Sequence, residues 1–535
     1  MPSLQFKGKQ FVANYHLGVP YCELIPQKSK SLTAKTSLHD NLILHGDNLK
    51  ALKALLPTYA GKVKCIYIDP PYNTGNEGWA YNDAVNSPMH KEWLGETVDR
   101  EDLTRHDKWL CMMMPRLKLL RDLLREDGAI FVSIDDNEVA HLRMLMDEVF
   151  GEENFVANVI WEKSDSPRMD AKFSVRHDHI LIYTNNKNIF APNNYIDEEI
   201  PEHYNKKDAN GRVYYLKPLR VMGGNISESL FYPLIAPDGT KVLPFESSGA
   251  KGCWRWSKKK IEAEIERIEW ISGKNGWNPY FKIYADKRKA MPIETIWNHQ
   301  EVGSNRTSKN EMRTIFSEDL FDTPKPVSLL KKIIQLSTDK DSIILDSFAG
   351  SGTTAHAVLA LNAEDGGNRK FILVECEDYA DTITAERVRR VMRGVPNAKD
   401  EKLRKGFGGS FSYFDLGKEI EMKTILNGKR LPSYSELARY VFYTATGEEW
   451  NEKTLNEKRH FIGESHEYEV YLFYEPDSAK LRSLAFNLTL ADKLGKPKEK
   501  KRLVFAPTKF LNQRQLDERK IVFSQLPFEI YQLTE

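Results

Sequence analysis

The sequence predicts an α/β protein built on a parallel sheet, and three features of the chain support this prediction. Short apolar runs that end in an acid or a glycine alternate with stretches of helical periodicity, as in strands joined by crossover helices. One of these runs, residues 63–69, stops at two consecutive prolines, which cannot continue a sheet. The length of 535 residues exceeds what one hydrophobic core supports, so we expect about two to four domains.

Six apolar runs are the predicted strands, and they occupy residues 41–47, 63–69, 128–135, 179–185, 342–348 and 370–376. Residues 107–127 have helical spacing, and Pro115 is expected to start or kink this helix. The three methionines at 112–114 are expected to fill the core. Asp135, at the end of the third run, is expected to cap the helix that follows.

The composition divides the chain into four parts. Residues 1–190 and 320–400 contain the strand runs and are predicted to be two halves of one α/β core. Residues 191–319 are polar and aromatic with frequent turn signals, which indicates an inserted, mainly β domain with one helix near 257–268. Residues 401–535 mix helical and β-like stretches and are predicted to form an α+β C-terminal domain.

Charge and cysteine content narrow the class of protein. The 77 basic and 76 acidic residues cancel to +1, so any binding of nucleic acid must depend on local basic patches. The five cysteines lie far apart without a CxxC pair, which favours reduced thiols and predicts neither a disulfide nor a structural metal. No long apolar run and no signal peptide is present, so we expect a soluble, cytoplasmic protein that does not enter membranes.

The stretch "LDSFAGSGTTAHA" follows a predicted strand and opens a helix. Its glycines, Gly350 and Gly352, allow the backbone to approach a ligand closely. A phosphate-binding loop would need a lysine before the serine or threonine, and the chain has none there, so we do not expect ATP hydrolysis. Glu375 ends the next strand at the spacing where an acid binds the hydroxyls of a ribose.

The stretch "IYIDPPYNTG" ends another predicted strand with an acid, two prolines and a tyrosine. Because prolines stop the strand, Asp69 and Tyr72 should be held rigidly at its carboxyl edge. This is the edge at which α/β proteins place their chemistry.

The two stretches together resemble the S-adenosylmethionine-dependent DNA amino-methyltransferases, whose hallmarks are [DNS]PP[YFW] and FxGxG. Asp69–Tyr72 match the first motif and precede the second motif at Phe348–Gly352, an order similar to the β group of these enzymes. "GDNLKAL", "FDTPKPVSLL" and the long C-terminal region look like the modification (Mod) subunits of type III restriction systems. The resemblance implies a circularly permuted, Rossmann-like methyltransferase sheet with an inserted, mainly β target-recognition domain.

For catalysis, the resemblance implies transfer of a methyl group to the N6 amine of an adenine flipped out of duplex DNA. Asp69 and the carbonyl of Pro70 would accept the hydrogens of the amine, Pro71 would stiffen the turn, and Tyr72 would stack on the base. An Asp at the first motif position favours adenine over cytosine, since cytosine N4 enzymes of this family usually have Ser there. Cytosine C5 chemistry needs a Pro-Cys dipeptide, which the chain lacks.

For binding, the resemblance implies S-adenosyl-L-methionine as the cofactor and double-stranded DNA as the partner. The cofactor residues would be Asp47 at the adenine amine, Thr323 and Lys325 at the methionine carboxylate, Asp346, Phe348, Gly350 and Gly352 in the loop, and Glu375 at the ribose. The base and DNA residues would be Asn73, His177, Arg220 and Arg255, while Trp254 and Trp256 are expected to be core. His177 and His179 are explained equally well as solvated residues at a strand edge. A restriction (Res) subunit and a second copy of the chain are further partners that the resemblance suggests.

Several other functions remain open from the sequence. The chain can be a stand-alone amino-methyltransferase that acts on adenine N6 or cytosine N4, or a DNA-binding protein that keeps the fold without activity. Enzymes that methylate RNA or protein glutamine use the same turn, but they usually begin it with Asn and lack a large insert. A fused nuclease is disfavoured because no convincing PD-(D/E)xK cluster is present.

Overall fold

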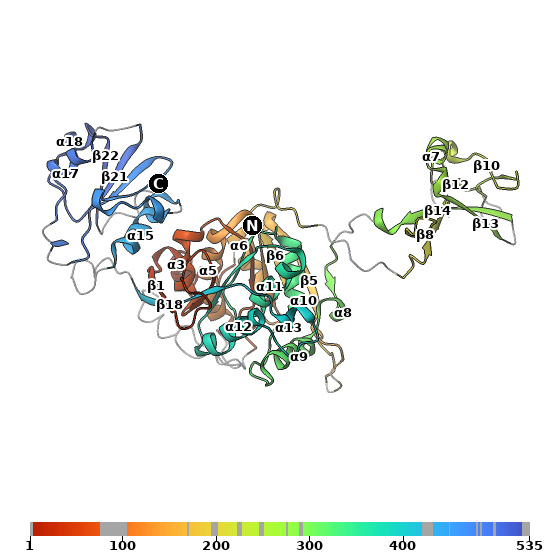
Figure 1. Ribbon diagram of the computed structural model, residues 1–535, viewed down its shortest axis with the longest axis horizontal. Coiled ribbons are helices and arrows are strands. Elements are labelled where there is room, and N and C mark those ends of the chain that lie inside the picture. Colours follow the sequence, from red (N-terminus) through yellow and green to blue (C-terminus); the bar gives the residue numbers. More distant parts are fainter. Residues whose placement is uncertain are drawn as a thin grey trace. The chain divides into compact units, whose positions relative to one another are not determined.

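The computed structural model shows the chain as two compact units, Asn194–Ile293 and the combination of Met1–Asn193 with Glu294–Glu535 (Figure 1). The structure describes residues 4–526 except 75–103, 168, 170, 194–201, 222–226, 246–250, 274–275, 288–292, 420–431, 449, 478–479, 482–483 and 496–498. The first unit contains both motif-bearing segments, so we describe it first.

A sheet of ten strands forms the centre of this unit, in the order β1-β18-β2-β17-β16-β3-β4-β6-β5-β15. The strands are β1 (Cys22–Pro26), β2 (Asn41–His45), β3 (Val63–Ile68), β4 (Leu124–Ile134), β5 (Phe155–Glu162), β6 (His177–Thr184), β15 (Ile296–Trp297), β16 (Ile343–Asp346), β17 (Lys370–Glu375) and β18 (Phe411–Glu419). All six predicted strands are present, as β2, β3, β4, β6, β16 and β17. The run from β18 to β4 is parallel, whereas β6 is antiparallel to both of its neighbours.

Strands β3 and β16 are neighbours in the sheet although they are far apart in the sequence. They pair in parallel, with Ile344 opposite Cys65 and Leu345 opposite Ile66. Figure 1 shows the same mixing, since red and orange elements of the first segment and teal elements of the second form one body. The two motifs therefore follow adjacent strands, as a permuted methyltransferase sheet requires.

Helices pack against the sheet and close its core. They are α1 (Lys9–Val12), α2 (Tyr15–Gly18), α3 (Asn48–Tyr59), α5 (Arg105–Leu123), α6 (Val139–Phe150), α8 (His299–Val302), α9 (Asn305–Phe316), α10 (Val327–Ser337), α11 (Thr353–Asp365), α12 (Glu386–Arg393) and α13 (Glu401–Lys405). The three methionines at 112–114 are buried in the main core, as predicted. Pro115 lies inside α5 and does not start it.

The predicted domain boundaries at 319 and 400 differ from the structure. Strand β15 lies within the predicted insert but pairs with β5 of the main sheet. Strand β18 lies within the predicted C-terminal domain but pairs with β2, and Phe411 and Tyr413 in it are fully buried. Composition could not reveal this, because the partner of an apolar run is set by pairing between segments distant in the chain.

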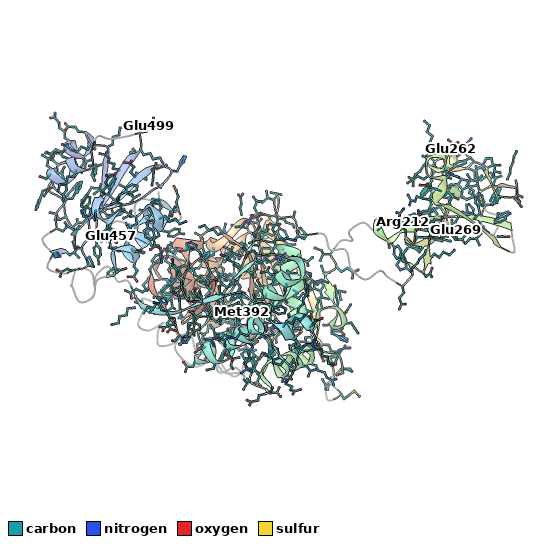
Figure 2. The ribbon with its side chains drawn as sticks, in the orientation of Figure 1. Arg212, Glu262, Glu269, Met392, Glu457 and Glu499 are labelled. Atoms are coloured by element: carbon teal, nitrogen blue, oxygen red, sulfur yellow. The ribbon has the colours of Figure 1, made fainter. Side chains whose placement is uncertain are left out.

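The second unit, Asn194–Ile293, is mainly β and has its own small core. Its strands are β7 (Lys206–Lys207), β8 (Val213–Pro218), β9 (Arg220–Val221), β10 (Leu234–Ile235), β11 (Lys241–Val242), β12 (Cys253–Trp254), β13 (Ile268–Gly273) and β14 (Gly276–Tyr284), with helix α7 (Lys258–Ala263). Trp254 and Trp256 are buried in this core, as predicted. Polar side chains also tie the unit together, because Glu269 accepts hydrogen bonds from Lys206 and Tyr214, and Arg212 pairs with Asp286 (Figure 2 labels Arg212 and Glu269).

The C-terminal region contains a four-stranded sheet with helices. Its strands, in sheet order, are β19 (Phe461–Glu464), β20 (Tyr468–Leu472), β21 (Lys501–Ala506) and β22 (Ile521–Gln525). The helices are α15 (Tyr434–Thr446), α17 (Leu488–Lys493) and α18 (Gln513–Asp517). The region mixes helices and strands, as predicted, but β20, β21 and β22 pair in parallel with α17 and α18 between them, so the arrangement is α/β and not the predicted α+β.

All five cysteines are free, four of them buried and Cys376 exposed. Within the described residues, no helix combines the length and the apolar character that crossing a membrane requires.

Candidate active site

A cavity of about 670 Å³ opens at the carboxyl ends of β3 and β16. Its volume lies in the range of small-molecule and cofactor sites. All four residues of the turn after β3 line it, namely Asp69, Pro70, Pro71 and Tyr72. Predicted cofactor residues also line it, namely Thr323, Lys325, Asp346, Phe348, Gly350 and Glu375. The fold thus brings the two motifs to one site.

The turn after β3 is held from both sides. Every residue of β3 is buried, so the turn starts from a rigid strand. The indole Nε1 of Trp109 on α5 donates a hydrogen bond of 2.7 Å to the carbonyl of Pro71. Tyr72 packs against the main core, and burial raises the pKa of its hydroxyl. These contacts restrain the turn on which Asp69 and Pro70 line the cavity.

Asn73, expected at the target base or DNA, instead supports the turn. It is fully buried, and its side-chain amide donates a hydrogen bond to Glu138. Its φ of 58° is the left-handed conformation that Asn tolerates better than most residues. Asn73 therefore holds the turn from beneath, and a contact with DNA would require it to leave its buried position.

Glu138, which the sequence prediction missed, connects several elements below the turn. Besides Asn73, His106 of α5 lies with Nδ1 2.5 Å from the carboxylate, and His141 of α6 lies 2.9 Å from it. The interaction with Glu138 raises the pKa of His141. Glu138, His106 and His141 together offer enough ligand atoms to hold a metal ion. Among the described residues, one other group does so, namely Asp136, His177 and His179. Since Asn73 and His106 already contact Oε1 of Glu138, we interpret the Glu138 group as a hydrogen-bonded support.

The carboxylate of Asp69 forms an ion pair with Lys325 through its Oδ2 atom. Its Oδ1 atom is buried and has no hydrogen-bond partner among the described residues. The Lys325 ammonium lies 5.1 Å from the ring centroid of Tyr72 and 6.0 Å from that of Trp161. The resemblance led us to expect Lys325 at the methionine carboxylate of the methyl donor, whereas in the structure Lys325 contacts the turn after β3.

Asp178 and Lys163 also line the cavity, and the sequence prediction did not include them. Lys163 Nζ lies 2.6 Å from Asp178 Oδ1. Asp178 is only 3% exposed, and this burial raises the pKa of its carboxyl. His177 and His179 flank it on β6 and point to the opposite face, 3.9 Å and 3.0 Å from Asp136. Strand alternation would have separated Asp178 from the two histidines.

The glycine loop between β16 and α11 requires glycine at two positions. Gly350 has a φ of 51°, and a Cβ there would lie 3.1 Å from the ring of Phe321. Gly352 has a φ of 77°, and a Cβ there would lie 3.0 Å from the carbonyl of Thr384. A side chain at either position would therefore be strained and crowded.

Two acids hold this loop in shape. Asp346 accepts hydrogen bonds from the Phe348 N–H at 3.1 Å and from the Thr354 hydroxyl at 2.5 Å, and burial raises the pKa of Asp346 to about 7. Glu375 accepts the Gly350 N–H at 2.7 Å and two further backbone N–H groups beyond its own strand. Burial raises the pKa of Glu375 as well.

Two acids near the site have other positions than expected. Asp47 is not among the described residues that line the cavity, whereas its neighbour Asn48 is. Asp47 instead caps α3, because its side chain accepts the Lys50 N–H at 3.0 Å. Asp135, expected to cap α6, does not cap it, because Glu138 occupies the N-cap position. Asp135 lines the cavity and accepts hydrogen bonds from Asn137.

The predicted DNA contacts of the insert lie in the second unit. Arg220 is partly buried and donates to Asn278 at 3.3 Å, whereas Arg255 is exposed and its Nε donates to the Pro218 carbonyl at 3.1 Å. Of the two, Arg255 has the more accessible guanidinium.

The chain matches the family model of DNA methylases over residues 63–386, which is more than half of its length. The chain belongs to the DNA methylase family. The StyLTI Mod subunit of a type III restriction-modification enzyme from Salmonella typhimurium is 34% identical over 72% of this chain and 62% of that protein. The type III EcoPI Mod subunit of Escherichia phage P1 is 32% identical over 79% of this chain and 73% of that protein. YhdJ, a DNA adenine methyltransferase of Escherichia coli, is 39% identical over 62% of this chain and 77% of that protein.

Family membership confirms the resemblance predicted from the two motifs. The methylase match begins at β3 and ends in α12, so it covers the turn, the insert and the glycine loop. Family membership places the chain among the DNA methylases, and two of its relatives are named as Mod subunits of type III restriction-modification enzymes. The chain spans 62% of the length of the StyLTI subunit.

Proposed function

We propose that this chain is a site-specific enzyme that methylates the N6 amine of adenine in double-stranded DNA. The observation that carries this proposal is the convergence of Asp69, Tyr72, Gly350 and Glu375 on one cavity. An acid and an aromatic ring at a rigid strand end suit an amine on a planar base, and a glycine loop beside an acid suits a nucleoside.

The residues of the cavity fit the donor. Besides its volume, the cavity offers Ser347, whose buried hydroxyl has no hydrogen-bond partner among the described residues. Glu375 would hold the ribose, and the loop of Phe348 and Gly350 would follow the donor closely because glycine leaves room there. Bound S-adenosyl-L-methionine supplies an activated methyl group.

The turn after β3 prepares the acceptor. An exocyclic amine is a poor nucleophile because its lone pair is delocalised into the ring. The Asp69 carboxylate and the Pro70 carbonyl accept its hydrogens, which favours a pyramidal nitrogen and stabilises the positive charge that develops there. Tyr72 stacks on the base, which must leave the duplex for its amine to reach Asp69 in the cavity.

Adenine is favoured over cytosine on two grounds. Asp69 occupies the position where the cytosine N4 enzymes of the family usually have Ser, and the relative YhdJ is named as an adenine methyltransferase. Methylation of cytosine N4 is the second candidate, because the same turn accepts any exocyclic amine.

The inserted unit would read the DNA sequence, with exposed Arg255 and partly buried Arg220 as candidate contacts to guanine or phosphate. Two relatives are Mod subunits of type III enzymes, so we also propose that the chain works with a restriction subunit. We propose the cytoplasm as its location, because the DNA that such an enzyme would modify lies there. A second copy of this chain is a further proposed partner.

Methyl transfer from tritiated S-adenosyl-L-methionine to unmethylated duplex DNA tests the reaction directly. Digestion of the product to deoxynucleosides should yield labelled N6-methyl-2′-deoxyadenosine with the native chain and none with Asp69→Ala. Labelled N4-methyl-2′-deoxycytidine would instead support the second candidate, and no label in DNA despite donor binding would refute both.

A further inference from the structure

Lys325 joins two segments of the site that are 256 residues apart in the sequence. Its ammonium forms an ion pair with Asp69 Oδ2, and the Lys325 side chain is only 11% exposed. The faces of Tyr72 and Trp161 lie 5.1 Å and 6.0 Å from the same ammonium. A lysine in this position is confined by a carboxylate and two aromatic rings, which attract a cation.

The ion pair leaves the two oxygens of Asp69 in different states. Oδ2 is satisfied by Lys325, whereas Oδ1 is buried without a hydrogen-bond partner among the described residues. A buried acceptor without a donor is costly, so a ligand that donates a hydrogen to Oδ1 gains that energy on binding. The target amine is such a ligand.

The charges around the cavity balance in pairs. Asp178 is paired with Lys163 at 2.6 Å, and Asp69 is paired with Lys325. A neutral base amine cannot neutralise a carboxylate, so without Lys325 the partly buried Asp69 carboxylate, whose side chain is 23% exposed, would lack its compensating charge.

We propose that Lys325 is a positioning residue, which holds the Asp69 carboxylate by Oδ2 so that Oδ1 accepts the target amine. The inference rests on the proposed function and gives Lys325 a task on the acceptor side of the site. It replaces the expectation that Lys325 binds the methionine carboxylate of the donor.

Three variants test the inference in the full-length chain. Lys325→Met keeps the length of the side chain without its charge, and Lys325→Arg keeps the charge. Lys332→Met is the matched control, because Lys332 is also partly buried, paired with Glu301 and placed 4.8 Å from the ring centroid of Trp297, but it lies outside the cavity lining. The measurements are kcat and KM for a methylatable DNA duplex and the dissociation constant for S-adenosyl-L-methionine.

For Lys325→Met, kcat should fall on the order of 100-fold, because a misplaced reacting group costs about that much. The dissociation constant for the donor should stay within about twofold, and Lys325→Arg should recover at least tenfold of the lost kcat. The control Lys332→Met should retain the native kcat. A parallel rise of the donor dissociation constant, or an unchanged kcat, would overturn the inference.

A thermal double-mutant cycle separates this inference from the proposed function. The melting temperature is measured for Asp69→Asn, Lys325→Met and the double variant, without DNA or donor. If the two residues are paired, the double variant should lose clearly less than the sum of the single losses. Strictly additive losses would refute the pairing, whereas a native chain that binds donor but methylates no DNA would refute only the proposed function.

Discussion

Carboxylates of similar chemistry have different partners around the cavity. Asp69 and Asp178 are each paired with a lysine, whereas Glu375 accepts three backbone N–H groups. In the proposed function, the paired acids belong to the acceptor side of the cavity, and the backbone-bound acid belongs to the side that takes the methyl donor. Single substitutions should therefore separate methyl transfer from donor binding.

Glu138 should stabilise the turn after β3 through Asn73. In Glu138→Ala, the buried side chain of Asn73 loses its acceptor and the partly exposed rings of His106 and His141 lose their ion-pair partner, which should cost about 1–3 kcal/mol of the free energy of unfolding. Methyl transfer should fall with it, because the turn loses its support. Urea unfolding and kcat measure the two effects.

Glu148→Ala is the control for this prediction. Glu148 also lies on α6 but forms a partly exposed ion pair with Lys9, which should be worth less than about 1 kcal/mol. Equal losses in the two variants would show that Glu138 has no special role.

Asp346 should make stability depend on pH. Burial raises its pKa from 3.8 to about 7, so between these values the folded chain holds a proton that the unfolded chain has released. Its contribution to stability therefore falls as the pH rises through this window. Asp346→Asn cannot ionise, so its melting temperature relative to the native chain should rise from pH 5 to pH 8 in the absence of donor.

Thermal scans at pH 5, 6, 7 and 8 check this difference. A difference that does not change with pH would mean that Asp346 is ionised in the folded chain throughout.

The site residues that the sequence predicted lie in contiguous motifs, where local chemistry is visible. Lys163, Asp178 and Glu138 escaped prediction because they meet the motifs only after β4, β5 and β6 pair. Asn73 was assigned to DNA because it follows Tyr72, but the left-handed turn at Asn73 directs its side chain inward. The burial and the hydrogen-bond partners of these side chains depend on tertiary contacts, which local sequence does not show.

At the scale of elements, the strand runs with continuous apolar character were predicted, and strands of mixed character were not. All of β3 is buried, so its run of mostly apolar residues is easily recognised as a strand. Strand β5 was missed because most of its residues are only partly buried, and β1 and β15 because they are short or lie at the sheet edge. Parallel neighbours such as β3 and β16 were inferred from the resemblance to the family, since spacing alone gives no pairing.

Strand β18 should be essential to the main sheet. A chain that ends at residue 400 loses β18 and exposes the edge of β2, whereas a chain that ends at residue 419 keeps the strand. The shorter chain should aggregate or unfold without a cooperative transition, and the longer chain should melt cooperatively and bind donor. Circular dichroism melting and donor titration compare the two. Equal behaviour would contradict the placement of β18 in the core.

At the scale of the whole molecule, donor binding and sequence recognition should belong to different units. The cavity is lined entirely by residues outside Asn194–Ile293, and the insert has its own core around Trp254. A core interrupted by such an insert remains one unit, because β15 after the insert returns to β5 before it.

Replacing residues 194–293 by a Gly/Ser linker should leave donor affinity within about threefold and abolish methylation at specific sites. Isothermal titration with S-adenosyl-L-methionine and methylation of duplex DNA measure the two properties. The double variant Arg220→Ala with Arg255→Ala is the milder control, and it should weaken DNA binding without affecting the donor. Loss of donor binding in the linker variant would contradict the division of labour.

The most direct test of the central claim is modification-sensitive long-read sequencing of DNA from a methylation-free bacterial host that expresses this chain. The account predicts N6-methyladenine at one short sequence motif with the native chain, and none with Asp69→Ala. Absence of any modified base with soluble native protein, or persistence of the modification in Asp69→Ala, would contradict it.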